Sequence, residues 1–296
     1  MLLPNPAVDE QALAALVAER YGADPTRLRF APVGGDGWHY RCRPFWVSVR
    51  RDRQGHAAAA YAAAAELAQA GLEFVLAPLA DAAGRVVHRL GSFPVVVLPL
   101  VEGTTLFESG LRAGEAATVA AMCERLQAAR CATELPVERF ELPFADELPA
   151  GLAAAATAGS RTGPYGAPLR DLVARNRDAI DAMVAEIAAL AAACRADPTP
   201  FVLTHGEPNR GNVLRDAAGR LHLIDWGDLR YAPRERDRTA LADLALELPM
   251  RPAFARFYRL RWDLGEIAEY VARFAAPHTG SIEADDKWQE LRLYLD

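Results

Sequence analysis

Apolar residues recur at helical spacing in some segments of the chain and gather into short strand-like runs in others. Residues 8–21 and 56–70 have apolar or alanine-rich helical patterns, and Gly71 is placed to end the second helix. Short apolar runs separated by turn residues predict strands around a glycine cluster at 34–37 and again at 73–100. The first hundred residues are therefore expected to form a mostly antiparallel sheet with one internal helix.

Helical periodicity dominates after this point. The segment 147–168 is rich in Gly, Pro and Ala, and it is expected to form a mobile surface segment. The predicted helices lie at 113–131, 168–196, 239–249, 266–275 and 285–295. The pattern predicts an α+β protein with a small β-rich lobe at residues 1–100 and a larger helical lobe at 101–296.

Composition and charge narrow the class of protein. The 296 residues are 51% hydrophobic and 24% charged, with a formal net charge of −6, and no long basic run occurs. Nucleic acid and anionic membranes are therefore not expected as partners. The negative net charge has two explanations. Either it simply keeps the protein soluble, or it reflects an acidic pocket for a cationic ligand.

The cysteines and the apolar runs indicate where the protein works. None of the four cysteines forms a C-x-x-C pair, and their spacing suggests no metal site. The N-terminus lacks the features of a signal peptide, and the apolar run at 93–101 is too short to span a bilayer. We expect a soluble, cytoplasmic protein with reduced thiols, as a monomer or homodimer.

Two motifs near residue 210 carry the candidate chemistry. "THGEPNRGN" (204–212) follows an apolar strand, and "LIDWGD" (223–228) follows another. A hairpin between them would bring Glu207, Asn212 and Asp225 into one region. An amide oxygen and a carboxylate suit Mg²⁺ bound together with phosphates, and a further carboxylate can orient a hydroxyl and accept its proton. These are the parts that phosphoryl transfer requires.

The paired motifs resemble those of the aminoglycoside phosphotransferase and choline kinase-like family, which has a protein kinase-like fold. The usual family pattern is H-G-D-x-x-x-x-N followed by I-D-[WF], and the "HGEP" spelling resembles a variation among actinobacterial members. The lobe order, the glycine turn, "PLVEG" at 99–103 and "PRERDRTAL" at 233–241 extend the resemblance over most of the chain.

The resemblance assigns roles to individual residues. It implies that Glu207 is the catalytic base, that Asn212 and Asp225 hold Mg²⁺, and that ATP is the co-substrate. His205 is expected to brace the loop. Ordinary turn chemistry, in which Asn and Asp satisfy backbone groups after strands, is the alternative.

The chain departs from the family pattern at two positions. Glu207 stands where the family has Asp, and Ser48 stands where the family has a lysine on the third strand. Lys287 is the only lysine in the sequence, so no lysine in the first half can compensate. Arg50 lies two residues on and points to the same face of the strand, so it can reach a phosphate or remain a solvated surface arginine. Glu66 is the candidate helix partner of the missing lysine.

The same resemblance suggests the nucleotide and acceptor contacts. Gly34, Gly35 and Gly37 are expected to face the phosphates, or to form a hairpin turn without a ligand. Leu98 and Leu100 would offer backbone groups to adenine. The candidate acceptor-binding residues are Trp226, Asp228, Asp286 and Trp288, with Tyr231, Asp263, Glu266 and Asp285 as further wall residues; single charges of this kind are otherwise solvated helix faces.

The function implied is an ATP-dependent small-molecule O-phosphotransferase with an alcohol group as acceptor, first of all an aminoglycoside or spectinomycin-like antibiotic. One alternative is a metabolic kinase for choline, a sugar or a nucleoside. The other is a catalytically weak nucleotide-binding pseudokinase. Neither ATP versus GTP nor the phosphorylated hydroxyl follows from the sequence.

Overall fold

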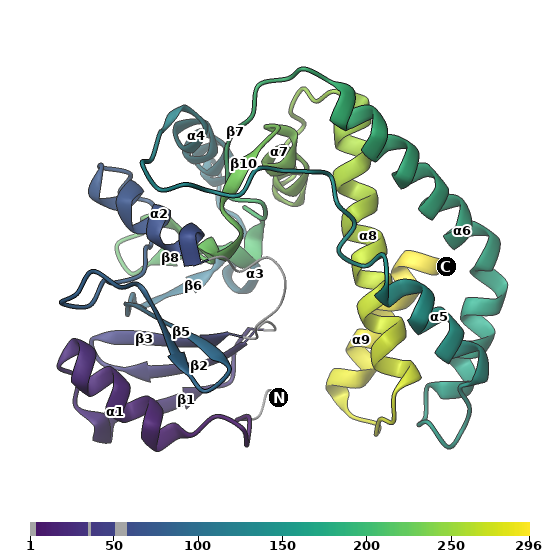
Figure 1. Cartoon of the computed structure of the whole chain (residues 1–296), viewed down its shortest axis with the longest axis horizontal. Helices are drawn as coiled ribbons and strands as arrows, with labels where there is room; N and C mark the ends of the chain where they lie inside the picture. The colour runs from purple at the N-terminus through teal and green to yellow at the C-terminus, as the bar shows by residue number, and fades with distance from the viewer. Residues whose placement is uncertain (1–3, 35–36, 51–57) are drawn as a thin grey trace. The chain divides into compact units, whose positions relative to one another are not determined.

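The computed structural model describes residues 4–34, 37–50 and 58–296. Contacts divide the chain into two compact units, which are Met1–Glu138 with Pro200–Pro249, and Arg139–Thr199 with Met250–Asp296. Figure 1 shows the course of the chain through both units. The expected lobe boundary at residue 100 stays a prediction.

A five-stranded antiparallel sheet forms the N-terminal part of the first unit, with strand order β1-β2-β3-β5-β4. Figure 1 shows β1, β2, β3 and β5 of this sheet. Its strands are β1 (Arg29–Ala31), β2 (Gly37–Cys42), β3 (Phe45–Arg50), β4 (Val87–Leu90) and β5 (Phe93–Pro99). Because successive residues of a strand face opposite sides, Val47 and Val49 point to one face of β3, and Ser48 and Arg50 point to the other. The two faces of this sheet serve different purposes.

Helix α1 (Glu10–Tyr21) covers the face that carries Val47 and Val49. Leu13 and Val17 of the helix are fully buried in the same cluster as these valines. Burial of each such side chain stabilises the fold by about 1.5–3 kcal/mol. This packing leaves the opposite face of β3 available for a site.

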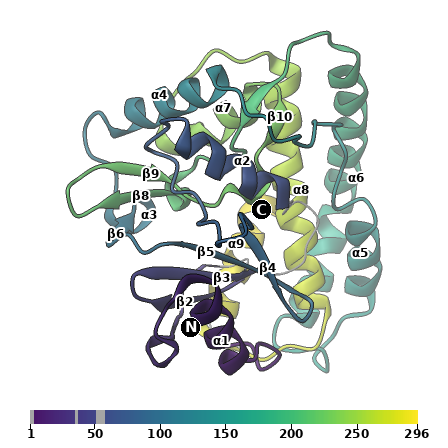
Figure 2. The same ribbon diagram turned by 60° about the vertical axis from the view of Figure 1, so that its left-hand side comes forward.

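Two further sheets follow in the first unit, and Figure 2 shows the hairpin between β8 and β9. One sheet has the order β6-β8-β9, and the other pairs β7 with β10. Their strands are β6 (Gly103–Thr105), β7 (Val202–Thr204), β8 (Val213–Asp216), β9 (Leu221–Leu223) and β10 (Arg230–Ala232). Val213 pairs with Leu223 across the antiparallel β8–β9 hairpin, so the residues just before β8 and just after β9 lie side by side. The hairpin predicted from the two motifs is confirmed.

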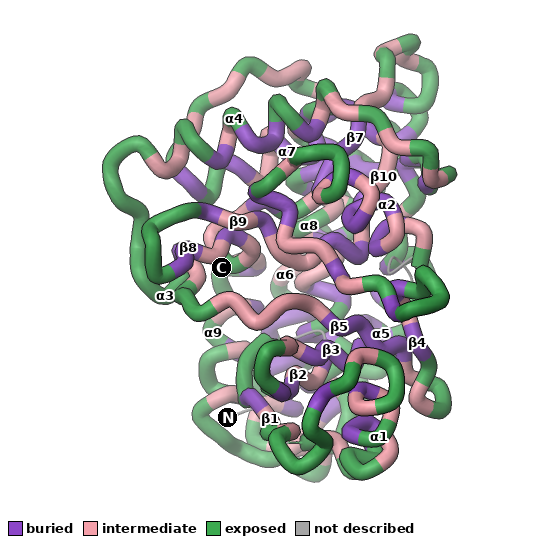
Figure 3. The backbone as a smooth tube through the Cα atoms, turned by 90° about the vertical axis from the view of Figure 1, so that its left-hand side faces the viewer, coloured by how far each residue is buried: buried purple, intermediate pink, exposed green. Residues whose placement is uncertain are grey.

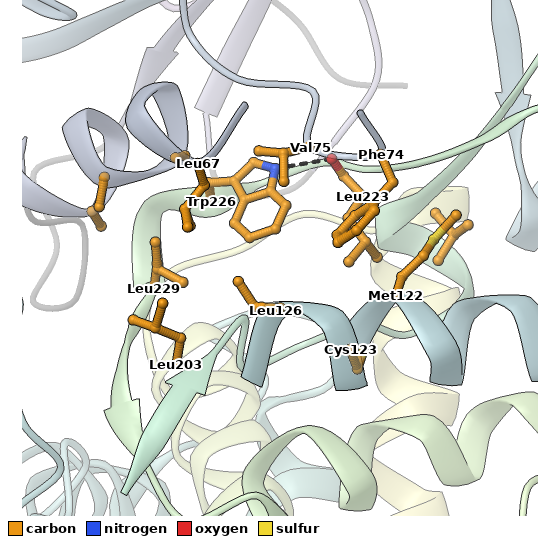
Figure 4. Packing of buried hydrophobic residues seen from close by; sticks show 14 of the residues in the cluster. Leu67, Phe74, Val75, Met122, Cys123, Leu126, Leu203, Leu223, Trp226 and Leu229 are labelled. Carbon is orange, nitrogen blue, oxygen red and sulfur yellow. Dashed lines mark hydrogen bonds between the residues drawn. The ribbon is translucent and has the colours of Figure 1, made fainter. Parts of the chain in front are cut away.

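The core of this part of the unit surrounds Trp226 (Figure 4). Its indole is 1% exposed and donates a hydrogen bond from Nε1 to the carbonyl oxygen of Leu223 at 2.9 Å. Leu67, Phe74 and Leu126 belong to the same buried cluster. The remaining helices of the unit are α2 (Ala58–Gln69), α3 (Leu106–Ser109), α4 (Glu115–Ala128) and α7 (Glu235–Leu241), with short 3₁₀ turns η1 (Pro25–Arg27), η2 (Arg210–Asn212), η3 (Trp226–Asp228) and η4 (Ala242–Leu244).

The second unit is helical. Its helices are α5 (Glu147–Thr157), α6 (Gly166–Ala196), α8 (Pro252–Ala275) and α9 (Ile282–Leu295). Buried residues recur along α8 at helical spacing, for example Phe257, Leu260 and Leu264. Figure 3 shows where buried, intermediate and exposed residues lie along the described backbone.

Three expectations about local structure were wrong. The helix expected at 239–249 is replaced by the end of α7 at Leu241 and the 3₁₀ turn η4, and residues 245–249 are not helical. Residues 147–157, expected to be part of a mobile surface segment, form α5, because a run of alanines has high helix propensity and Leu148 and Leu152 are buried. Residues 73–81, expected to be a strand, make only the isolated bridge of Val75 with Leu223. Within the described residues, no helix combines the length and the apolar character needed to cross a membrane.

Candidate functional site

A pocket of about 480 Å³ opens inside the first unit, on the face of β3 opposite α1. Ser48 and Arg50 line it, together with Trp46 two residues earlier on the same strand. Its other lining groups include residues 33–34, 76, 78, 105 and 214, and residues from β2, the end of β5 with residues 100–103, α2, α3, η2 and residues 224–226. Segments far apart in the sequence therefore supply one cavity.

The loop after β7 carries Glu207, and a buried carboxylate fixes its main chain. Asp237 on α7 accepts hydrogen bonds from Gly206 N at 2.7 Å and from His205 N at 3.3 Å. Its side chain belongs to a residue with no exposed surface, and burial raises the pKa of Asp237, although the bond from Gly206 opposes that shift. From the sequence, Asp237 is expected only within the helix start at 233–241, and its bonds to the main chain of His205 and Gly206 emerge from the structure.

His205 braces this loop, as the resemblance implied. Its Nε2 donates to the carbonyl oxygen of Ile224 at 2.8 Å, and its Nδ1 accepts from Glu207 N at 3.3 Å. The imidazole also meets the Trp226 ring edge-on, with the centroids 4.7 Å apart. Burial lowers the pKa of His205, which favours the neutral ring that these bonds require. The residue therefore ties the Glu207 loop to the segment before Asp225.

Asn212 and Asp225 lie in the same pocket. Ile224 N donates to the carbonyl oxygen of Asn212 at 3.0 Å, so the two motifs are joined by their main chains. The side chain of Asn209 accepts from Asn212 N at 3.2 Å and caps η2. The side-chain amide of Asn212 donates to the main-chain oxygen of Glu207 at 3.0 Å, which leaves Oδ1 as its acceptor atom.

Asp225 adopts a left-handed backbone conformation, with φ 64° and ψ 65°. Such a conformation is uncommon for a residue with a side chain, and residues of this kind cluster at functional sites. The carboxylate of Asp225 pairs with the guanidinium of Arg50, with Nη2 at 3.1 Å from Oδ1. Arg50 is 5% exposed, so it is not the solvated surface arginine that the sequence left open.

The oxygen atoms of Asn212 and Asp225 fit a hard divalent cation. Among the described residues, no group of three or more His, Cys, Asp or Glu side chains is placed to hold a metal ion by itself. Mg²⁺ is commonly held by one or two protein carboxylates together with phosphates and water, so two protein ligands in a pocket suit it when a nucleotide supplies the rest.

Gly34 and the end of β5 also border the pocket. Gly34 lines it in a left-handed conformation, and Gly37 pairs with Arg50 at the start of β2, where a side chain would collide with Val49 O. Gly35, the third predicted glycine, lies outside the described residues.

Leu98 and Leu100 line the pocket as well, but the amide of Leu100 is already used. It donates to the carbonyl oxygen of Pro44 at 2.8 Å, and Pro99 has no N–H to offer. Val101 is therefore the next main-chain donor along this segment, a detail that the sequence pattern did not show.

The candidate acceptor residues of the first unit are held by other protein groups. Trp226 packs in the core described above and also lines the pocket. Asp228 accepts hydrogen bonds from the guanidinium groups of Arg230 and Arg236. Tyr231 lies on β10, opposite Leu203 of β7.

The acceptor candidates Asp285, Asp286 and Trp288 of the second unit lie on α9, and the further candidates Asp263 and Glu266 lie on α8. Asp286 is exposed, and Trp288 is 8% exposed and stacks on Tyr165 with the ring centroids 5.0 Å apart. The hydroxyl of Tyr165 donates to Asp285. A role of these residues in acceptor binding stays a prediction.

Glu66 does not take the place of the helix glutamate that the sequence suggested. Its carboxylate accepts from Thr133 N at 3.1 Å and Thr133 Oγ1 at 2.9 Å, and also from Ala132 N. These bonds lower the pKa of Glu66 and anchor the segment after α4. The glutamate lies near the C-terminal end of α2, where it serves this loop.

Trp46 is a pocket residue that the sequence analysis missed. It stacks on His39 with the centroids 5.4 Å apart, and both residues line the pocket. Its position two residues before Ser48 places it on the same strand face, and this alternation was the signal that could have found it.

Comparison with known proteins agrees with this fold. Residues 39–277 match the model of the phosphotransferase enzyme family, and the chain belongs to that family. The protein is accordingly a phosphotransferase that acts on hydroxyl groups, with the kinase-like fold of the aminoglycoside phosphotransferases and choline kinases.

Particular relatives are similar along nearly their whole length. Protein StrN of Streptomyces griseus is 38% identical over 310 residues, covering 100% of this chain and 96% of that protein. The structure of spectinomycin phosphotransferase APH(9)-Ia with ADP and spectinomycin aligns with a TM-score of 0.76 at 16% identity, covering 97% of this chain and 94% of the other. A choline/ethanolamine kinase family protein from Mesorhizobium loti aligns with a TM-score of 0.56 at 19% identity, covering 96% and 94%.

Proposed function

We propose that this protein transfers the γ-phosphoryl group of ATP to a hydroxyl of an aminoglycoside or spectinomycin-like antibiotic. The observation that carries the nucleotide part is the pocket in which Asn212, Asp225 and Arg50 meet the end of β5. The fold likeness to a spectinomycin phosphotransferase bound to ADP supports both the nucleotide and the acceptor class. The net charge of −6 is compatible with a cationic acceptor.

Each residue has a defined part in the proposed reaction. Glu207 orients the acceptor hydroxyl and takes its proton as the new O–P bond forms and ADP leaves. Asn212 Oδ1 and the Asp225 carboxylate would hold Mg²⁺, which would supply positive charge to offset the charge that develops on the phosphates. His205 and Asp237 keep the Glu207 loop in place through the bonds described above.

The nucleotide would lie along the face of β3. Trp46 and Leu98 offer apolar surface to the base, and Val101 N offers a main-chain donor. Gly34 borders the region proposed for the phosphates, and Gly37 pairs with the pocket residue Arg50. Trp226, Asp228, Asp286 and Trp288 are the residues proposed to bind the acceptor. The Asp228 carboxylate already accepts hydrogen bonds from Arg230 and Arg236, so a cationic group of the acceptor would share it with them or displace them.

Transfer assays with defined variants test this function. The protein is incubated with Mg²⁺-ATP and a panel of aminoglycosides, spectinomycin, choline, ethanolamine, sugars and nucleosides, and each acceptor is monitored by mass spectrometry for the gain of a phosphate. We expect transfer to an antibiotic in the panel, and its collapse in Glu207→Gln and Asp225→Asn. Asp178→Asn, which makes the same chemical change on the exposed surface of α6, is the matched control.

Other results have distinct meanings. Transfer only to choline or another metabolite would keep the mechanism and replace the acceptor class, which the fold likeness to choline kinases allows. Suppose the protein binds nucleotide but neither transfers phosphate to any acceptor nor slowly hydrolyses ATP. That result would favour the pseudokinase alternative. Full turnover in Glu207→Gln and Asp225→Asn would refute the assigned roles.

A further inference from the structure

The ion pair between Arg50 and Asp225 joins the two sides of the pocket. Arg50 Nη2 lies 3.1 Å from Oδ1 and 3.3 Å from Oδ2 of Asp225, so the guanidinium faces both oxygens of the carboxylate. The side chain of Arg50 is 6% exposed and that of Asp225 is 29% exposed. Arginine stays charged under all ordinary conditions, so the carboxylate has a permanent cation beside it.

Ser48 lies two residues before Arg50 on the same strand face. It is 4% exposed and lines the pocket, and its Oγ makes no hydrogen bond to any described residue. Because buried hydroxyl groups are nearly always hydrogen-bonded, an unpaired one at a pocket wall indicates that a ligand atom completes it. A serine is too short to replace a lysine by itself, but its hydroxyl can donate to a phosphate oxygen.

The charged carboxylate that faces Arg50 is the one assigned to the metal. Glu66, the acidic residue of α2, is committed to the segment at Ala132 and Thr133. Arg50 and a divalent cation would therefore bind the same carboxylate, that of Asp225. Because both are positively charged, they compete for it. Nucleotide phosphates offer the guanidinium an alternative anion of matching geometry.

We propose that Arg50 and Ser48 together replace the missing lysine, and that Arg50 exchanges partners when the metal–nucleotide complex binds. Without nucleotide, Arg50 neutralises Asp225 and disfavours binding of the free cation. With nucleotide, its guanidinium moves to the α- and β-phosphates beside Ser48 Oγ, and Asp225 becomes available to the cation. The inference rests on the proposed function, and it predicts that cation and nucleotide enter the site as a pair.

Direct binding measurements on the intact protein test the exchange without relying on turnover. Mn²⁺, as a spectroscopic substitute for Mg²⁺, is titrated alone by electron paramagnetic resonance, and Mg²⁺-ADP is titrated by calorimetry. For Arg50→Met we expect Mg²⁺-ADP affinity to fall by roughly 10-fold or more, as loss of a charge-assisted contact implies. Mn²⁺ alone should bind several-fold more tightly, because the competing cation is gone.

Conservative and matched variants make the result specific. Arg50→Lys should recover part of the nucleotide affinity and keep free Mn²⁺ binding weak. Ser48→Ala should weaken Mg²⁺-ADP by roughly 3- to 10-fold with Mn²⁺ unchanged. Arg29→Met, which removes an exposed arginine from β1, should change neither affinity. Thermal unfolding of each variant shows whether it is folded. If Arg50→Met does not fold, Arg50→Lys and Ser48→Ala provide the test.

The outcomes separate this inference from the proposed function. If Arg50→Met or Arg50→Lys binds both ligands as the native protein does, the exchange is refuted. Unchanged nucleotide affinity in Ser48→Ala would remove Ser48 from the scheme. If transfer collapses in Asp225→Asn while the Arg50 variants bind normally, the proposed function stands and only the exchange falls.

Discussion

The side-chain amide of Asn212 donates a hydrogen bond to the main-chain oxygen of Glu207 at 3.0 Å. The proposed metal ligand thereby also positions the proposed base, because one end of its amide faces the loop and the other end is an acceptor. An aspartate at this position would keep the oxygen ligand but lose the donor. This relationship allows the two roles of the residue to be separated.

We therefore predict that Asn212→Asp retains cation binding but loses transfer. Its turnover should fall by roughly 100-fold or more, because small displacements of a positioned group are that costly. Mn²⁺ binding in the presence of ADP, compared with the rate of phosphate transfer, is the measurement. Equal loss of both properties would show that the bond to Glu207 has no separate importance.

Gly206 is predicted to be intolerant of a side chain. Its φ is +105°, and an added Cβ would collide with the guanidinium of Arg236. Gly219, at φ +83° with open space around it, is the matched control. Gly219→Ala should cost about 1–2 kcal/mol in free energy of unfolding from backbone strain. Gly206→Ala should cost at least about 1 kcal/mol more, since the collision adds to the strain.

Urea denaturation of both glycine variants gives the comparison, together with transfer assays. We expect Gly206→Ala also to lose turnover, because Asp237 and His205 hold the same stretch of main chain. Equal stability losses in the two variants would mean that Arg236 moves aside easily.

The buried imidazole of His205 predicts a dependence of stability on pH. Burial lowers its pKa in the folded protein, so the unfolded chain binds the proton more readily. The contribution to stability is therefore intact above the unfolded pKa of about 6.5 and declines as the pH falls below it. His205→Gln removes this titration but keeps a hydrogen-bonding side chain.

The free energies of unfolding of the native protein and of His205→Gln, measured from pH 7.5 down to pH 5, test this. The native protein should be the more stable at the upper end, and its advantage should shrink as the pH falls. His88, whose pKa burial also lowers, is present in both proteins and cancels from the difference. A constant or growing advantage at low pH would contradict the prediction.

Glu66 is predicted to matter for stability and not for nucleotide binding. Glu66→Ala removes the acceptor of the bonds from Ala132 and Thr133, so its melting temperature should fall. Its affinity for Mg²⁺-ADP should equal that of the native protein. A clear loss of affinity for Mg²⁺-ADP in Glu66→Ala would show that Glu66 does contribute to nucleotide binding.

Sequence reasoning reached the parts of the site that depend on local pattern. The β8–β9 hairpin follows from turn residues between two apolar runs, and it brings Asn212 and Asp225 together. The position of Arg50 on the pocket face follows from strand alternation.

The parts that escaped depend on tertiary contacts. From the sequence, Glu66 on α2 could face the pocket or accept hydrogen bonds from the loop at Thr133. Only the packing of α2 determines that it contacts the loop. The contact of Asp237 with Gly206 joins residues that no periodicity links. Helix α5 escaped because glycine and proline around it indicated a loop, whereas buried leucines and alanine propensity prevail.

The serine in the middle of β3 has a practical consequence for how this protein is detected. Nucleotide-based affinity reagents that acylate amines report on kinases through a lysine beside the phosphates. Here the strand carries Ser48 and Arg50, and the single lysine of the sequence, Lys287, belongs to α9 in the other unit. Because none of the described residues that line the pocket is a lysine, reagents built on that reaction would find no amine to label among them.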